Sequence, residues 1–320
     1  MKFTKDLINI DAASEAERII KKLKEEVAFR FRRKGAVIGV SGGIDSSVVL
    51  ALCVKAFGPE RVFVLMLPER DSSPDSLTLA KQLSEKFGVQ YKVEQISDAL
   101  DGFGCYQRRD EAVRRIFPEY DSTYKMKIGI PKEEGLLNFF NITIISPDGE
   151  QITQRLPLNE YLQIVAASNF KQRSRMCMLY YYAELKNYCV IGTGNKNEHE
   201  QGFFVKHGDG AADLKPIAHL FKSQVYQLAE YLQIPEEIQR RTPTTDTYSA
   251  EQTQEEFFFR TPFKILDRVW FGWERGFSPS DIAAALNLSQ ENVNNIISDI
   301  KRKIKTTEYL RHEPIINCTP

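Results

Sequence analysis

Short, almost continuous apolar runs alternate with amphipathic stretches along the first hundred residues of the chain. Continuous apolar runs are typical of strands buried on both faces, whereas apolar positions three and four residues apart indicate helices. The predicted strands cover 36–40, 61–67 and 89–96, and the predicted helices cover 14–34, 48–57 and 74–87. Strands that alternate with helices at this spacing predict an α/β fold with a doubly wound parallel sheet.

The remaining chain interrupts this alternation once and then resumes it. Two β-rich runs flank the turn 146–149, which predicts a β-hairpin within an insertion over 118–157. Further predictions are helices over 98–117, 158–186 and 221–232, and strands over 188–191 and 213–217. We therefore expect one domain over 1–265, and a helical extension over 266–320 that packs on it. In open parallel sheets, ligands bind beyond the carboxyl ends of the strands, so the loops there are candidate sites.

The loop after the first predicted strand, S-G-G-I-D-S-S at 41–47, carries the first candidate chemistry. A glycine turn between a strand and a helix presents backbone N–H groups and the positive end of the helix dipole to an anion. Asp45 would repel that anion unless a divalent cation lay between them, so the loop predicts a polyphosphate with Mg2+. The loop has neither Walker A spacing nor the pattern G-x-G-x-x-G. An ordinary turn tightened by glycines is the alternative.

A second glycine-bearing polar loop covers residues 192–200. Its Glu198 supplies a second carboxylate for the cation that Asp45 would hold, because Mg2+ in nucleotide sites commonly takes one or two carboxylates plus phosphate oxygens. Lys222 lies near the start of a predicted helix, where the dipole disfavours a cation. We therefore expect Lys222 to face an anionic ligand.

Four other basic side chains are candidates with open roles. His199 and His207 are tempting acid–base groups, but neither has a paired residue, and structural roles are the alternative. Arg173 and Arg175 are two positions apart and do not share a helix face. One of them is expected to reach a substrate while the other makes a structural ion pair.

Composition limits the class of protein. The chain has 43 Lys+Arg and 43 Asp+Glu, and this zero net charge argues against a dedicated nucleic-acid binder. Residues 278–303 nevertheless have a helix-turn-helix pattern with Ser289 as the cap of its second helix, so nucleic-acid binding is a minor alternative. Five cysteines without a C-x-x-C pair indicate reduced thiols in a cytoplasmic protein. No apolar run is long enough to predict a membrane span.

Two motifs carry a family resemblance. The S-G-G-I-D-S of 41–46 resembles the pyrophosphate loop of the N-type ATP pyrophosphatases, which adenylate a carboxylate or a base and release pyrophosphate. The runs G-T-G-N-K-N-E at 192–198 and G-F-F-V-K-H-G-D-G-A-A-D-L-K-P at 202–216 closely resemble the NAD synthetases within that superfamily. The resemblance implies an adenine nucleotide α-hydrolase-like fold. It also implies ATP-dependent amidation of deamido-NAD by ammonia through an acyl-adenylate, with NAD, AMP and pyrophosphate as products.

The resemblance further implies roles for individual residues. The expected Mg2+ ligands are Asp45 and Glu198. The residues that match the ATP site are Ser41, Gly42, Gly43, Asp45, Ser46, Ser47, Thr193, Lys222 and Thr244. The residues that match contacts to deamido-NAD are Arg173, Lys206 and Asp213. The catalytic groups are then Asp45, Glu198 and Lys222, and no side-chain nucleophile is required.

The sequence departs from the family pattern near its C-terminus. The His-Lys pair of the family is Tyr309-Leu310 here, with Arg311 and His312 as neighbouring candidates. About 35 residues precede the first predicted strand, too few for the glutamine-hydrolysing domain of larger members. Ammonia is therefore expected to be free or delivered by a separate glutaminase partner. A homodimer is expected, and a related pyrophosphatase that adenylates another carboxylate or a tRNA base is the main alternative.

Overall fold

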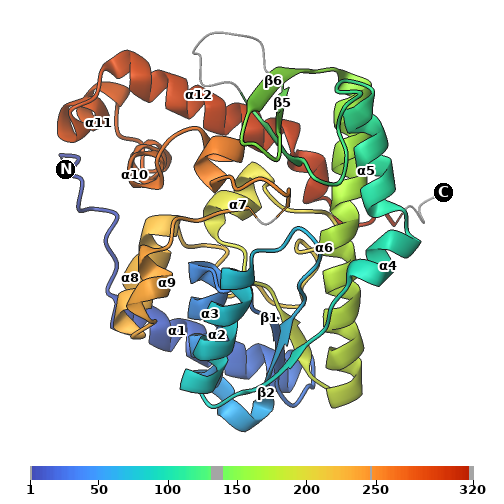
Figure 1. Ribbon diagram of the computed structural model, residues 1–320. Coiled ribbons are helices and arrows are strands. Elements are labelled where there is room, and N and C mark those ends of the chain that lie inside the picture. The colour runs from blue at the N-terminus through green and yellow to red at the C-terminus, as the bar shows by residue number, and fades with distance from the viewer. Residues whose placement is uncertain (1, 131–139, 246, 317–320) are drawn as a thin grey trace.

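A four-stranded parallel sheet in the order β3-β2-β1-β7 forms the centre of the molecule (Figure 1). The computed structural model describes residues 2–130, 140–245 and 247–316. Strand β1 pairs with β2 on one side and with β7 on the other, both in parallel. The predicted doubly wound parallel sheet is therefore confirmed.

Helices follow the strands of this sheet and also build the second half of the chain. The strands are β1 (Ala36–Gly39), β2 (Val62–Met66), β3 (Gln90–Val93), β4 (Lys125–Gly129), β5 (Phe140–Ile145), β6 (Gln151–Leu156) and β7 (Cys189–Ile191). The α-helices are α1 (Ala12–Glu25), α2 (Ile44–Phe57), α3 (Pro74–Lys86), α4 (Ser97–Gly102), α5 (Cys105–Arg114), α6 (Leu158–Lys186), α7 (Lys196–Gln201), α8 (Lys222–Tyr231), α9 (Glu236–Arg240), α10 (Phe263–Glu274), α11 (Pro279–Leu286) and α12 (Gln290–Thr306).

The two faces of the sheet are covered by different helices. Successive side chains of a strand point to opposite faces. Ile38 of β1 is fully buried in the core shared with α1, α2, α3 and α8, whereas Val37 is fully buried in the core shared with α4, α5 and α6. Helix α2 is buried along most of its length, because its sequence is apolar on all sides. This burial fixes the N-terminus of α2 at the carboxyl end of β1.

The insertion is a small antiparallel sheet in the order β4-β5-β6. The predicted hairpin corresponds to β5 and β6, while β4 was not predicted. Residues 131–139, which include the start of the first β-rich run, lie outside the described residues. The buried face of this sheet, with Met126 and Ile144, packs in one core with Val113 of α5 and Ile164 of α6.

Three predicted boundaries were wrong for identifiable reasons. The helix predicted over 98–117 divides into α4 and α5, because Gly104 takes a φ of 66° and interrupts the helical path. The strand predicted over 213–217 is reduced to one parallel bridge between Ile191 and Leu214. Helix α1 begins earlier than predicted because Asp11 accepts hydrogen bonds from the N–H groups of Ala13 and Ser14.

The C-terminal helices α10, α11 and α12 form their own apolar core. Phe3 and Ile8 from the N-terminal segment are buried in it, and Figure 1 shows this end of the chain beside α10 and α11. The expected boundary after residue 265 falls inside α10. Ser289 caps α12 by accepting a hydrogen bond from the N–H of Asn292 (3.1 Å), as predicted. Among the described helices, none is long and apolar enough to cross a membrane.

Candidate active site

A large cavity of about 780 Å³ opens where β1 and β7 end, as the parallel sheet predicts. Most of the predicted site residues line it: Ser41, Gly43, Asp45, Ser46, Arg173, Thr193, Glu198, Lys206, Lys222 and Thr244. The loop 41–47, the start of α7, the start of α8 and the middle of α6 therefore meet in one space. Gly42, Ser47 and Asp213 are the predicted site residues outside its described lining.

The loop before α2 is shaped to receive an anion. Gly42 has a φ of 75°, and a Cβ there would come within 2.6 Å of the Ser76 carbonyl oxygen, so this position needs glycine. Gly43 is the N-cap of α2 and offers no side chain to its first N–H groups. These groups remain available to a phosphate. Ser47 lies beneath the loop, where its hydroxyl donates to the Gly43 carbonyl (2.8 Å).

Asp45 lies at the centre of a polar network. Its carboxylate accepts hydrogen bonds from the ammonium of Lys222 and from the amide nitrogen Nδ2 of Asn195 (3.0 Å). Lys222 is 1% exposed, so its charge has left water and is balanced by Asp45. The three side chains come from α2, α8 and the loop before α7, which are far apart in the sequence.

Glu198 is held beside Asp45 by a capping box at the start of α7. Asn195 Oδ1 accepts from the Glu198 N–H (3.1 Å), and Glu198 Oε2 accepts from the Asn195 N–H (3.1 Å). Gln254 Nε2 donates to the other carboxylate oxygen (3.3 Å). Burial and then the negative charge of Asp45 raise the pKa of Glu198 to about 8, although Lys222 opposes this shift. The two carboxylates thus share one low-dielectric space.

These two carboxylates fit a cation that takes only part of its ligands from protein. No group of three or more His, Cys, Asp and Glu side chains within the described residues could hold a metal ion. An all-protein metal cage is therefore not built here. Mg2+ in nucleotide sites usually takes one or two carboxylates and completes its shell with phosphate oxygens and water. The pair Asp45 and Glu198 meets that requirement, and a cation would also relieve their mutual repulsion.

The lining of the cavity also includes the basic residues Arg173 and Lys206 and part of the C-terminal segment. Arg173 Nε donates to the Lys206 carbonyl (3.3 Å), and Lys206 Nζ donates to the carbonyls of Tyr309 (3.0 Å) and His312 (3.0 Å). Tyr309 and Leu310 line the cavity, in the place where the sequence departs from the family pattern. Arg311 donates to the carbonyl of Ile304 (2.6 Å). The Lys206 ammonium thus fastens the C-terminal segment to the site.

The other candidates have more limited roles. Asp213 accepts from the Val190 N–H (2.8 Å) and the Tyr180 hydroxyl (3.1 Å), so its carboxylate supports β7. His207 lines the cavity, whereas His199 stacks on Phe204 outside its described lining. Burial and then the charges of Lys215 and Arg311 lower the pKa of His199, which keeps its imidazole neutral.

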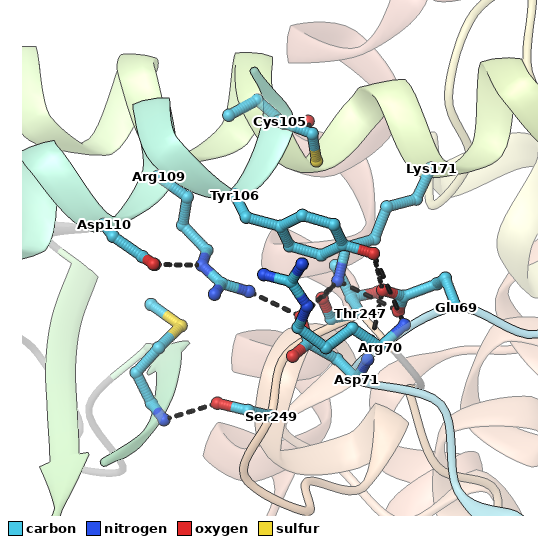
Figure 2. Close-up of polar contacts among 12 residues, drawn as sticks. Glu69, Arg70, Asp71, Cys105, Tyr106, Arg109, Asp110, Lys171, Thr247 and Ser249 are labelled. Atoms are coloured by element: carbon cyan, nitrogen blue, oxygen red, sulfur yellow. Dashed lines mark hydrogen bonds and ion pairs between the residues drawn. The ribbon is translucent and has the colours of Figure 1, made fainter. Parts of the chain in front are cut away.

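A buried charge cluster supports the cavity wall, and sequence reasoning did not find it (Figure 2). It comprises Glu69, Asp71, Tyr106, Arg109 and Lys171, whose side chains are all buried. Lys171 Nζ donates to Glu69 (3.1 Å), Asp71 (2.6 Å) and the Thr247 carbonyl (2.8 Å). The Tyr106 hydroxyl donates to Glu69 (2.7 Å), and Arg109 pairs with Asp71. The carboxylates of the loop after β2 are therefore structural.

Arg175 also holds the loop after β2, through contacts of its own. Arg175 donates to the Leu67 carbonyl (3.1 Å) and to the Ser72 hydroxyl (3.4 Å), both in the loop after β2. Arg175 lines the cavity as Arg173 does, but its guanidinium is engaged with this loop. The structural partners of Arg175 are thus a carbonyl and a hydroxyl rather than the carboxylate of the expected ion pair, and the substrate role of Arg173 stays a prediction.

Two other residues of the site were missed in the sequence. Asn195 joins Asp45 to Glu198, and Gln254 reaches Glu198 from a distant loop. The spacing of Asn195 and Glu198 is the pattern of a capping box, so this part was open to prediction. Gln254 carries no local signal, because its contact depends on the tertiary fold.

The chain is similar over most of its length to known proteins of one family. The family model described as NAD synthase matches residues 15–116 and 139–314. The relative named NH(3)-dependent NAD(+) synthetase of Rhizobium meliloti (strain 1021) is 49% identical over 314 residues, covering 98% of this chain and 94% of its own length. Its namesake from Thermotoga maritima is 38% identical over 269 residues, covering 83% of this chain and 89% of its own length.

Two solved structures are similar over almost the whole chain. The NH3-dependent NAD synthetase of Campylobacter jejuni, solved with nitrate, is 25% identical with a TM-score of 0.63 and covers 96% of this chain and 99% of its own. An NMN synthetase from Francisella tularensis has a TM-score of 0.66 at 23% identity and covers 97% of this chain and 100% of its own. At that identity the second structure shows the shared fold alone.

Proposed function

Because this chain belongs to the NAD synthase family, we propose that it amidates deamido-NAD with ammonia at the expense of ATP. The products are NAD, AMP and pyrophosphate. The observation that carries the proposal is the convergence of Asp45, Glu198 and Lys222 at one end of the cavity, beside a loop built for phosphates. Arg173 and Lys206 line the same cavity, and their positive charges suit an anionic dinucleotide.

The first half-reaction forms a bond between a carboxylate oxygen of the nicotinate and the α-phosphorus of ATP. The loop 41–47 and the N-terminus of α2 orient the phosphate chain, and Ser41 and Ser46 add hydroxyl groups. Lys222 lies next to the loop and balances the charge that gathers on the departing pyrophosphate. Ammonia then attacks the acyl carbon and displaces AMP. Positioning supplies most of the catalysis.

Asp45 and Glu198 would hold Mg2+ in this site, and Asn195 keeps both carboxylates oriented. When bound, the cation would supply charge neutralisation of the pyrophosphate that leaves. Gly42, Gly43, Ser47, Thr193 and Thr244 complete the proposed ATP site. Within this site, Ser47 supports the loop, because its hydroxyl donates to the Gly43 carbonyl.

The deamido-NAD site is proposed to include Arg173, Lys206 and Asp213. Arg173 and Lys206 line the cavity directly, whereas Asp213 acts through β7 by its bond to Val190. Lys206 also holds the carbonyl of Tyr309, so the segment with Tyr309-Leu310 takes the place of the usual His-Lys pair as a wall of the site.

We also propose a homodimer, in which α6 contributes to the interface. This helix exposes several large apolar side chains, namely Leu158, Leu162, Tyr181 and Leu185. For the helix-turn-helix pattern, the burial of Val293, Ile297 and Ile300 of α12 supports a structural role in the C-terminal core. Because α10 spans residue 265, the expected boundary between the domain and its helical extension lies within a helix.

The proposal is tested by following pyrophosphate release from ATP, Mg2+ and ammonium with deamido-NAD and with a panel of other carboxylic acids. We expect release with deamido-NAD above all other acids. Release with another acid, and none with deamido-NAD, would contradict the substrate while leaving the ATP chemistry intact.

A further inference from the structure

Helix α8 begins with an unusual N-terminus. The first N–H groups of a helix have no partner within it and are commonly capped by the side chain of the preceding residue. Here the preceding residue is Phe221, whose side chain has no oxygen. Its first helical residue is Lys222, a cation at the positive end of the helix dipole. Both features need compensation, because Lys222 is 1% exposed.

That compensation comes from two distant side chains. Asn197 Oδ1 accepts from the Lys222 N–H (3.0 Å), and Asp267 Oδ2 accepts from the Ser223 N–H (2.7 Å). Asn197 Nδ2 donates to Asp267 Oδ1 (2.6 Å), which closes the chain of bonds. Asn197 and Asp267 are both fully buried. The N-terminus of α8 is therefore capped from α7 and α10.

Asp267 determines which group donates and which accepts in each of these three hydrogen bonds. An ionised carboxylate only accepts, so it turns the NH2 group of Asn197 toward itself and the oxygen of Asn197 toward Lys222. Burial raises the pKa of Asp267 to about 6, while the bonds from Ser223 and Asn197 oppose this shift. The group is thus ionised at neutral pH. Its negative charge also offsets the dipole at the residue that carries the Lys222 ammonium.

We propose that Asp267 is a positioning residue for the catalytic centre, because its carboxylate caps α8 and orients Asn197. Through α8 it sets the backbone of Lys222, and through Asn197 it sets the residue next to Glu198 on α7. The inference rests on the proposed function, which gives Lys222 and Glu198 their roles. It assigns a catalytic contribution to the C-terminal extension, which otherwise looks like a separate packing unit.

The test exploits the polarity of the bonds. In Asp267→Asn, one amide oxygen can still accept from Ser223, but the amide NH2 then faces the NH2 of Asn197. A flip of Asn197 moves the conflict to the Lys222 N–H. The double variant Asp267→Asn with Asn197→Asp restores every donor and acceptor: the new amide donates to the new carboxylate, which accepts from Lys222.

The matched control is Val269→Ala in the same helix. Val269 is fully buried in the C-terminal core, so this variant loses stability without touching the polar chain. We would measure thermal unfolding, and kcat and KM for ATP and deamido-NAD, on folded protein at pH 8. We expect kcat to fall by about 10- to 100-fold in Asp267→Asn, with smaller changes in KM. We expect kcat of Val269→Ala to stay within about twofold of wild type, and the double variant to recover most of kcat.

Two results would overturn the inference: a kcat of Asp267→Asn within twofold of the Val269→Ala value, or a double variant with no more activity than Asp267→Asn. Lys222→Met separates this failure from failure of the proposed function. If Lys222→Met retains wild-type kcat, the catalytic assignment itself is wrong. If Lys222→Met is inactive while Asp267→Asn is fully active, only the positioning role of Asp267 is wrong.

Discussion

Replacing Lys171 by methionine tests how much the buried charge cluster contributes to stability. Methionine has similar length but no charge, and it removes three hydrogen bonds, to Glu69, Asp71 and the Thr247 carbonyl. Removing one partner from a buried ion pair typically costs 3–5 kcal/mol, because the remaining charge stays buried without compensation. Asp71 keeps Arg109 and Glu69 keeps the Tyr106 hydroxyl, so we expect the lower end, about 3 kcal/mol.

The pH dependence of this loss follows from Asp71. Burial would raise the pKa of Asp71, but Lys171 and Arg109 outweigh burial and hold it below its ordinary value. A carboxyl group with a lowered pKa stabilises the fold above its unfolded pKa, near 3.9, and loses this contribution as pH falls through the folded value. In Lys171→Met that contribution shrinks. The difference in stability between wild type and variant is therefore largest at neutral pH and narrows below about pH 4.

The assay is urea unfolding at several pH values, with thermal unfolding in parallel. For a chain of 320 residues, a loss of about 3 kcal/mol should lower Tm by roughly 4–5 °C. The control is Arg240→Met, which removes the surface pair with Glu236; the two side chains are 77% and 71% exposed. The Arg240→Met substitution should lower the free energy of unfolding by no more than about 0.5 kcal/mol. A loss below about 1 kcal/mol in Lys171→Met would refute the reasoning that the cluster holds the loop after β2.

Three other predictions concern the catalytic centre. Asp45→Ala should lower kcat by about 1,000-fold or more and should also lower Tm, because it leaves the buried Lys222 ammonium without its carboxylate; retained turnover would contradict the role of Asp45. Asn195→Ala should lower activity about 10- to 100-fold, since it removes the amide that donates to Asp45 and that accepts from the Glu198 N–H; normal Mg2+ dependence would argue against this bridge. Glu198→Gln should raise the Mg2+ concentration for half-maximal activity, and an unchanged Mg2+ titration would remove Glu198 from the metal site.

The parts of the fold that rest on local patterns were predictable. The strands β1 and β2 are continuous apolar runs, and α6 occupies the predicted range 158–186, because these 29 residues contain neither glycine nor proline to interrupt a helix. The third strand was predicted too long, and β4 was missed, because short strands depend on their partners more than on their own sequence.

The candidate site was predictable where its residues carry a local signal in the sequence. Asp45 and Glu198 belong to glycine-rich loops whose composition indicates phosphate and metal chemistry. Asp267 gave no such signal, since a single acid in an amphipathic helix is ordinary until tertiary structure buries it against Ser223. The same is true of Lys171, which looked like one of several charges on α6 but is 1% exposed in the folded chain.

The most direct test of the central claim is to identify the product formed from isotopically labelled ammonium. The protein would be incubated with ATP, Mg2+ and deamido-NAD, and the nucleotides analysed by mass spectrometry. The proposed reaction predicts label in the carboxamide of NAD, with one AMP and one pyrophosphate formed for each amide. Pyrophosphate release without labelled NAD, or amidation that does not depend on ATP, would contradict it.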